Sequence, residues 1–150
     1  MGSPQPGLIV MADDDLDDQA LTRRALGKSH SRNALTLVNN GEDLLDLLRK
    51  EGRFVNNPIE RPALILLDLN MPLKNGFDAL REIRADERLR DLPVVMLSTS
   101  RFEEDVAKSF KLGCNSFLMK PDSFEGMAKL MGELTRYWFE VSRIPGVGEG

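Results

Sequence analysis

Carboxylate, hydroxyl and amine side chains stand in this sequence directly after short apolar runs. They are Asp13, Asp14, Asp68, Ser98 and Lys120. If the runs are parallel strands, these side chains meet at one edge of a sheet, where open α/β sheets bind their ligands. Three carboxylates that meet there repel one another, and a hard divalent cation such as Mg²⁺, or Mn²⁺ in its place, relieves the repulsion.

A carboxylate beside a metal ion, an ammonium and a hydroxyl forms a site for a phosphoryl group. The metal ion and Lys120 would neutralise the oxygens of the transferring group, and Ser98 would donate a hydrogen bond. Asp68 would be the nucleophile and form an aspartyl phosphate. Taken singly, each residue has a simpler interpretation, because acidic and hydroxyl residues after strands often cap helices. Only their joint placement favours phosphoryl chemistry.

Apolar runs with β-branched residues alternate along the chain with segments long enough to form helices. The runs are Leu8–Ala12, Ala34–Val38, Ala63–Leu67, Pro93–Leu97 and Ser116–Met119. Three of them are almost continuously apolar, as in strands buried on both faces of a parallel sheet. The alternation predicts an α/β fold with a doubly wound, five-stranded parallel sheet and five helices. With strand order 2-1-3-4-5, the first and third strands are neighbours, and Asp13, Asp14 and Asp68 converge.

Pairs of capping residues three positions apart indicate where helices start. They are Asp15 with Asp18, Asn40 with Asp43, Ser100 with Glu103, and Asp122 with Glu125. Apolar residues at helical spacing then indicate the buried side of each helix. They put Val106 and Phe110 in the core on the fourth helix, and Trp138 and Val141 on the fifth.

Composition limits the classes of protein that the chain can represent. The 150 residues suit one domain, and 20 basic against 24 acidic residues leave no basic excess for broad nucleic-acid binding. The single cysteine, Cys114, cannot form an internal disulfide, which favours a reducing compartment. No apolar run approaches the length of about 20 residues that a membrane span needs. We therefore expect a soluble cytoplasmic protein and exclude a zinc finger, a disulfide scaffold and a two-domain enzyme.

The motifs at the strand ends resemble, together and in order, the receiver domain of two-component response regulators. They are Ile-Val-Met-Ala-Asp13-Asp14, Leu-Leu-Asp68-Leu-Asn-Met-Pro, Pro-Val-Val-Met-Leu-Ser98 and Ser-Phe117-Leu-Met-Lys120-Pro121. The resemblance implies a flavodoxin-like receiver fold over residues 8–143. It leaves residues 1–7 as a flexible N-terminus and residues 144–150 as a short C-terminal tail, with no effector domain.

The resemblance also implies which acidic residue accepts the phosphoryl group and which ones bind the metal ion. Asp68 resembles the phosphoacceptor of the family. Asp14 resembles the direct Mg²⁺ ligand, with Asp13 acting through water and Asn70 supplying its backbone carbonyl. The family accepts the phosphoryl group from a histidine kinase, so the protein is expected to be a phosphoacceptor that at most dephosphorylates itself, and not an enzyme.

Residues of the last two strands resemble the family's switch. Ser98 corresponds to a hydroxyl that moves onto the phosphoryl group, and Lys120 to an invariant lysine whose bond to Pro121 is expected to be cis. Phe117 corresponds to an aromatic residue whose rotamer follows the hydroxyl. Many members have Thr and Tyr where this chain has Ser98 and Phe117. Phenylalanine donates no hydrogen bond, so a switch here works by packing, and the alternative is that Phe117 is an ordinary core residue.

Finer details are similar to single-domain regulators that pair with bacterial phytochromes. They include the long loop before the third strand and the aromatic run Tyr137-Trp138-Phe139. This resemblance implies a bacteriophytochrome as the kinase, and a homodimer formed through the fourth helix, fifth strand and fifth helix. If Trp138 and Val141 face the core, Tyr137 and Phe139 point elsewhere, so the three aromatic residues are interface candidates. The alternative is that the C-terminal tail folds back over them.

Two other hypotheses compete with a phosphorylated switch. The chain could be a degenerate receiver that acts as a scaffold or dimer without phosphorylation. It could also be a phosphatase of the haloacid-dehalogenase type, which likewise combines an Asp nucleophile with Mg²⁺. Such enzymes resemble Asp-x-Asp-x-Thr, and the run Asp68-Leu-Asn70 lacks the second carboxylate, which argues against turnover of an external substrate.

Overall fold

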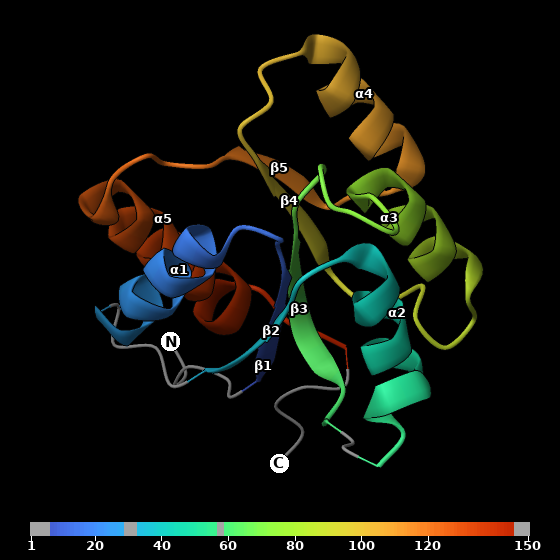
Figure 1. The fold of residues 1–150 in the computed structure, drawn as a ribbon. Helices are drawn as coiled ribbons and strands as arrows, with labels where there is room; N and C mark the ends of the chain where they lie inside the picture. Colours follow the sequence, from blue (N-terminus) through green and yellow to red (C-terminus); the bar gives the residue numbers. More distant parts are fainter. Residues whose placement is uncertain (1–6, 29–32, 57–58, 146–150) are drawn as a thin grey trace.

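The computed structural model describes residues 7–28, 33–56 and 59–145, and a single parallel sheet runs through its centre (Figure 1). Its strands are β1 (Leu8–Ala12), β2 (Ala34–Val38), β3 (Pro62–Leu67), β4 (Val94–Ser98) and β5 (Ser116–Met119). Their order is β2-β1-β3-β4-β5. The predicted α/β fold and strand order are confirmed, and predicted and observed strand ends differ by at most one residue.

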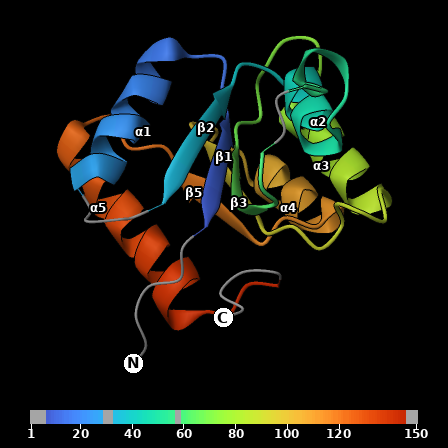
Figure 2. The ribbon, with the colours of Figure 1, turned by 90° about the horizontal axis from the view of Figure 1, so that it is seen from below.

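Helices cover both faces of the sheet, as Figure 2 shows from below. They are α1 (Leu16–Lys28), α2 (Gly41–Arg49), α3 (Gly76–Ala85), α4 (Glu103–Leu112) and α5 (Phe124–Arg136), with a 3-10 turn η1 (Gly52–Phe54) and a π-helical turn η2 (Tyr137–Val141). Helices α1 and α5 pack on one face, and α2, α3 and α4 on the other. None of the helices in the described part of the chain is both long and apolar enough to cross a bilayer.

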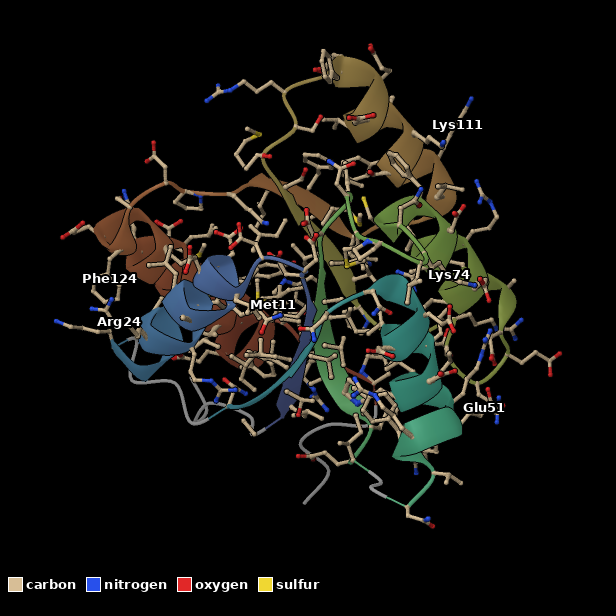
Figure 3. All side chains as sticks on the ribbon, in the orientation of Figure 1. Met11, Arg24, Glu51, Lys74, Lys111 and Phe124 are labelled. Carbon is tan, nitrogen blue, oxygen red and sulfur yellow. The ribbon has the colours of Figure 1, made fainter. Side chains whose placement is uncertain are left out.

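Two apolar cores fill the space between the sheet and its helix layers. Because successive strand residues point to opposite faces, Val10 joins the core beneath α2 and α3, while Ile9 joins the core beneath α1 and α5. All residues of β1, β3 and β4 are buried, which explains their continuous apolar sequences. At the outer contact of α1 and α5, the Arg24 guanidinium stacks 4.6 Å from the centre of the Phe124 ring (Figure 3).

Half of the predicted helix caps are correct. Asp15 accepts bonds from the amides of Asp17 and Asp18, and Asn40 accepts one from Asp43.

The predictions for the last two helices are wrong. Helix α4 begins after Phe102, whose side chain has no acceptor for a cap. Ser100 lies before this position, and its hydroxyl donates to Asp105 across 2.5 Å. Helix α5 is capped by Ser123, whose hydroxyl accepts from Gly126, so Asp122 is not its cap. Phe110 is also not a core residue, since 51% of it is exposed.

The π-helical turn overturns the predicted burial of the aromatic run. A π-helix bonds each residue to one five positions away, so it shifts the side-chain pattern away from the α-helical one. Phe139 is consequently 1% exposed and packs in the core beneath α1 and α5, while Val141 is 52% exposed. Trp138 is half-buried and Tyr137 is exposed. Phe139 is therefore not an interface candidate, and the prediction that Val141 lies in the core is wrong.

Gly7 and Ile144, near the two ends of the described chain, lie against this second core. Gly7 lies so close to Ala63 that a Cβ atom on it would fall 2.7 Å from the Ala63 Cβ. Ile144 is buried in the same core as Phe139. Pro145, the next residue of the predicted tail, is exposed, and residues 1–6 and 146–150 lie outside the described residues.

Lys50 ends α2 in a conformation that favours glycine. Its φ is +59°, and its amide donates to the carbonyls of Asp46 and Leu47. Its side chain is exposed, and a non-glycine residue in this region is strained. We expect Lys50→Gly to raise the free energy of unfolding by about 0.5–1 kcal/mol, since relief of the strain outweighs the added flexibility of the unfolded chain.

Urea unfolding monitored by circular dichroism measures this effect. The control is Lys129→Gly, which replaces an exposed lysine inside α5 and should lower the free energy of unfolding by about 1 kcal/mol. A loss of stability in Lys50→Gly comparable to that of the control would contradict the prediction.

Candidate functional site

Asp13 and Asp68 lie side by side because the ladder between β1 and β3 continues into the residues that follow. Ala12 is paired with Leu67, and the Asp68 amide donates to the Ala12 carbonyl across 3.0 Å. One carboxylate oxygen from each of Asp13, Asp14 and Asp68 lies within 4.8 Å of the others. Asp13 and Asp68 are buried and Asp14 is exposed, so the cluster opens to solvent on one side.

A tight loop after β3 holds Asp68 in place. The Leu69 amide donates to Asp68 Oδ1 across 2.8 Å, and the Gly76 amide donates to the Leu69 carbonyl. A Cβ atom on Gly76 would fall 2.2 Å from the Asp68 carbonyl oxygen, so only glycine allows α3 to start this close to the strand end. Asn70 is exposed in this loop.

Lys120 reaches the buried carboxylates from the end of β5. Its Nζ lies 2.7 Å from Asp13 Oδ2 and 3.4 Å from Asp68 Oδ2, and the side chain is 6% exposed. A third carboxylate, Asp18 on the first turn of α1, accepts a hydrogen bond from the same ammonium across 2.8 Å. Sequence reasoning assigned Asp18 only to the start of α1, because nothing in the sequence relates it to a lysine 102 residues away.

The peptide bond that follows Lys120 differs from the prediction. No peptide bond in the described part of the chain is cis, so the expected cis bond between Lys120 and Pro121 is trans in this structure. The Lys120 amide donates to the Ser98 carbonyl, which continues the β4–β5 ladder to the site. This backbone contact fixes where the lysine side chain starts.

Ser98 is buried at the end of β4 and is linked to α4 by hydrogen bonds. Its Oγ accepts from the Ser100 amide across 3.0 Å. The Ser100 hydroxyl in turn donates to Asp105, in the first turn of α4. The hydroxyl at the sheet edge is thus two hydrogen bonds away from the start of α4.

Phe117 lies further from the carboxylates, within β5. It pairs with Met96 and packs, half-buried, against the core beneath α2 and α3. Its neighbour Leu118 packs against the opposite core. The contacts of Phe117 are those of a core residue at the edge of the sheet.

The chemistry of these donors fits a divalent cation. Three carboxylates contact or approach one ammonium, and Asp14 adds a further negative charge beside them. Asp13 Oδ2 is completely buried, and the Lys120 ammonium lies 2.7 Å from it. An all-oxygen set with excess negative charge and an open side suits Mg²⁺ or Mn²⁺.

Burial sets the protonation of the metal-free site. It raises the pKa of Asp68 to about 6, with a smaller increase from Asp13 and an opposing decrease from Lys120. Burial likewise raises the pKa of Asp13. Burial alone would lower the pKa of Lys120, but its bonds to Asp13 and Asp18 outweigh that effect and raise the pKa, so the ammonium keeps its charge.

The raised pKa of Asp68 predicts how stability depends on pH. Asp68 holds its proton more tightly in the folded protein than in the unfolded chain, where the pKa of an aspartate is 3.8. The contribution of Asp68 to the stability of wild type is therefore lost as the pH rises from about 4 to 6, by at most about 3 kcal/mol. Without divalent metal, Asp68→Asn lacks this loss, so it should be more stable than wild type at pH 7.5 and lose the advantage near pH 4.

Urea unfolding in EDTA at the two pH values measures the difference. Glu140→Gln, which removes an exposed carboxylate, should show no such pH-dependent gain. If Asp68→Asn differs from wild type by the same free energy of unfolding at both pH values, ionisation of the buried Asp68 carboxylate does not destabilise the wild-type protein.

Known proteins are similar to this chain in sequence and in fold. The model of the response regulator receiver domain matches residues 9–131. The response regulator Rcp1 of Synechocystis sp. is 34% identical over 143 residues, which cover 95% of this chain and 96% of Rcp1.

Solved structures agree with the fold. The phosphorylated cyanobacterial phytochrome response regulator RcpA superposes with a TM-score of 0.86 at 33% identity, covering 93% of this chain and 99% of RcpA. The Mn²⁺-bound form of Rcp1 gives a TM-score of 0.84 at 33% identity, covering 94% of this chain and all of that one. With the family match over residues 9–131, these similarities identify the chain as a member of the response regulator receiver family.

Proposed function

We propose that this protein accepts a phosphoryl group on Asp68 from a histidine kinase and thereby alters a protein-binding face. The observation that carries the proposal is the Asp68 carboxylate, buried beside Asp13 and Asp14 and 3.4 Å from the Lys120 ammonium. Receiver domains in general are phosphorylated by histidine kinases. What is proposed for this chain is the identity of the acceptor and the role of each neighbour.

Asp13, Asp14 and Asp68 would hold Mg²⁺, or Mn²⁺ in its place, together with the backbone carbonyl of Asn70. Bound there, the cation would supply positive charge to the phosphoryl oxygens. The exposed side at Asp14 is where the cation and the phosphoryl donor can enter. The Mn²⁺-bound form of the relative Rcp1 supports a metal site of this kind.

The residues of the chain would position the reacting carboxylate and receive the new charge. The Leu69 amide holds Asp68 Oδ1, which fixes the carboxylate plane. An Asp68 oxygen attacks phosphorus, the P–N bond of the phosphohistidine breaks, and the freed imidazole takes a proton from solvent. Lys120 pairs with the oxygens of the transferred group. The kinase supplies the phosphoryl group, so the chain itself turns over no external substrate.

The output is proposed to begin at Ser98. Movement of its hydroxyl onto the phosphoryl group would withdraw the acceptor of the Ser100 amide, and Ser100 bonds directly to Asp105 on α4. Phe117 has no hydroxyl, so its part in the switch would be repacking at the edge of the core beneath α2 and α3. Both changes would alter the surface formed by α4, β5 and α5.

The similarity to Rcp1 and to the phytochrome response regulator RcpA supports a bacteriophytochrome as the kinase. The same proposal puts the protein in the cytoplasm, where a buried free thiol such as Cys114 stays reduced.

The surface of β5 and α5 suits a homodimer. Tyr137 is 54% exposed beside the half-buried Trp138, and Val141 follows them on η2. A hollow between the two elements is lined mainly by apolar and aromatic residues, together with one serine and one glutamate: Leu118, Leu130, Leu134, Tyr137, Trp138, Ser116 and Glu133. Aromatic residues exposed beside apolar side chains are typical of interface centres. We propose that a second copy of the chain covers this surface.

Phosphorylation by acetyl phosphate tests the acceptor. With Mg²⁺, intact-mass spectrometry should show one added phosphoryl group on wild type, because Asp68 is the nucleophile, and none on Asp68→Asn. EDTA should abolish the adduct if the cation is required. An adduct that persists in Asp68→Asn would assign the phosphoryl group to another residue, and no adduct or beryllofluoride binding in wild type would favour the scaffold hypothesis.

Lys120→Ala separates acceptance from switching. Asp68 stays in place, so some phosphorylation should remain, but the ammonium that pairs with the phosphoryl oxygens is gone. We expect a reduced phosphorylation-dependent change in the amide NMR signals of α4 and β5. Signals that shift as fully as in wild type would show that Lys120 has no part in the switch.

The dimer is tested by Tyr137→Arg, which places a charge at the centre of the proposed contact. We expect its dissociation constant to rise at least tenfold, measured by analytical ultracentrifugation with and without beryllofluoride. Val55→Arg, an equally exposed apolar position beside η1, should leave dimerisation unchanged. Wild type that stays monomeric under both conditions would refute the proposed dimer.

A further inference from the structure

Asp18 is a carboxylate at the site for which the proposed phosphoryl transfer has no role. It projects from the first turn of α1 and accepts a 2.8 Å hydrogen bond from Lys120 Nζ. That contact is shorter than the 3.4 Å between the same ammonium and Asp68. The side chain of Asp18 is 27% exposed, whereas that of Lys120 is 6% exposed. The lysine is thus held in a buried position with its ammonium directed toward α1 as well as toward the sheet.

Asp18 differs from the other carboxylates around Lys120 in its relation to a cation. Asp13 and Asp68 belong to the group of oxygens that could hold a divalent metal, and Asp18 does not. A cation in that group competes with the ammonium for Asp13 and Asp68. The cation does not compete for Asp18. Asp18 is therefore the carboxylate that still pairs with Lys120 when the cation is bound.

A lysine ammonium has three donors, and here it faces three carboxylates. When a cation weakens its contacts with Asp13 and Asp68, the contact with Asp18 is the one that still draws the ammonium away from a phosphoryl group on Asp68. The contact with Asp18 is charge-assisted and competes directly with the new one.

We infer that Asp18 is a positioning residue that holds Lys120 back from Asp68 and so weakens the binding of a phosphoryl group there. This inference rests on the proposed function, since it concerns the affinity of the same site. Asp18 thereby sets the balance between the free and phosphorylated states without touching the phosphoryl group. Its removal should release the ammonium toward Asp68.

Asp17 provides a matched control. It occupies the same first turn of α1 and carries the same charge, but it is exposed and forms no ion pair among the described residues. The amides of Asp17 and Asp18 both bond to Asp15, so either asparagine substitution leaves the helix cap in place. Asp17→Asn and Asp18→Asn therefore remove equal charge from the helix terminus, and only one of them frees Lys120.

The inference predicts that Asp18→Asn changes the affinities for beryllofluoride and for Mg²⁺ in opposite directions. Beryllofluoride mimics the phosphoryl group, and its affinity at saturating Mg²⁺ can be measured by titration with ¹⁹F NMR. Asp18→Asn should bind it about tenfold more tightly than wild type, because one competing charge-assisted bond is lost. Mg²⁺ alone, measured by calorimetry, should bind more weakly to Asp18→Asn, because the released ammonium pairs more closely with Asp13 and Asp68. Asp17→Asn should stay within about twofold of wild type for both probes.

A purely structural role for Asp18 would weaken the binding of both probes together. Unchanged or weaker beryllofluoride binding by Asp18→Asn, with wild type binding normally, overturns the inference and leaves the proposed function intact. Failure of wild type itself to bind beryllofluoride with Mg²⁺ overturns both. In a Lys120→Ala background the Asp18→Asn substitution should lose its effect on beryllofluoride affinity, and an undiminished effect would show that Asp18 does not act through the lysine.

Discussion

The convergence of buried carboxylates on one ammonium is the constraint on which the rest of this structure depends. Asp13 and Asp68 lie at adjacent strand ends, and their charges would repel each other without Lys120. Parallel order brings β1 beside β3, and the β4–β5 ladder delivers the lysine from the other side. At neutral pH the excess charge of this site lowers the stability of the fold. A bound cation or phosphoryl group can satisfy that charge, so the same excess favours binding.

The loops that follow β3 and β4 hold the side chains of the site in fixed positions. Gly76 lets α3 begin against the Asp68 carbonyl, where any side chain would collide with it. The loop after β4 is held differently, by bonds from Ser100 to both Ser98 and Asp105. One loop is therefore fixed by close backbone packing, and the other by side-chain hydrogen bonds that a moving hydroxyl can break. The second loop is the one that leads to α4.

The C-terminal segment shows how a local change in helix geometry selects a surface. The π-helical turn η2 rotates Phe139 into the core beneath α1 and α5 and leaves Tyr137 and Val141 exposed. Burial of Phe139 anchors the end of α5 near Ile144. The same rotation leaves an apolar surface between β5 and α5, at the β5 edge of the sheet.

The strands and the side chains that follow them could be predicted from the sequence, because strand burial and strand-end chemistry are local properties of each run. The strand order was expected of a doubly wound fold, and the structure confirmed it. The sequence named Asp13, Asp14, Asp68, Ser98 and Lys120 without knowledge of their contacts. Tertiary structure alone decided three other features. Asp18 meets Lys120 only because the fold brings the first turn of α1 to the residue that follows β5, and no local pattern relates residues so far apart. Phe139 is buried because a π-turn changed the helical phase on which the prediction depended. Phe110 is exposed, and Ser109 is the only buried residue of α4.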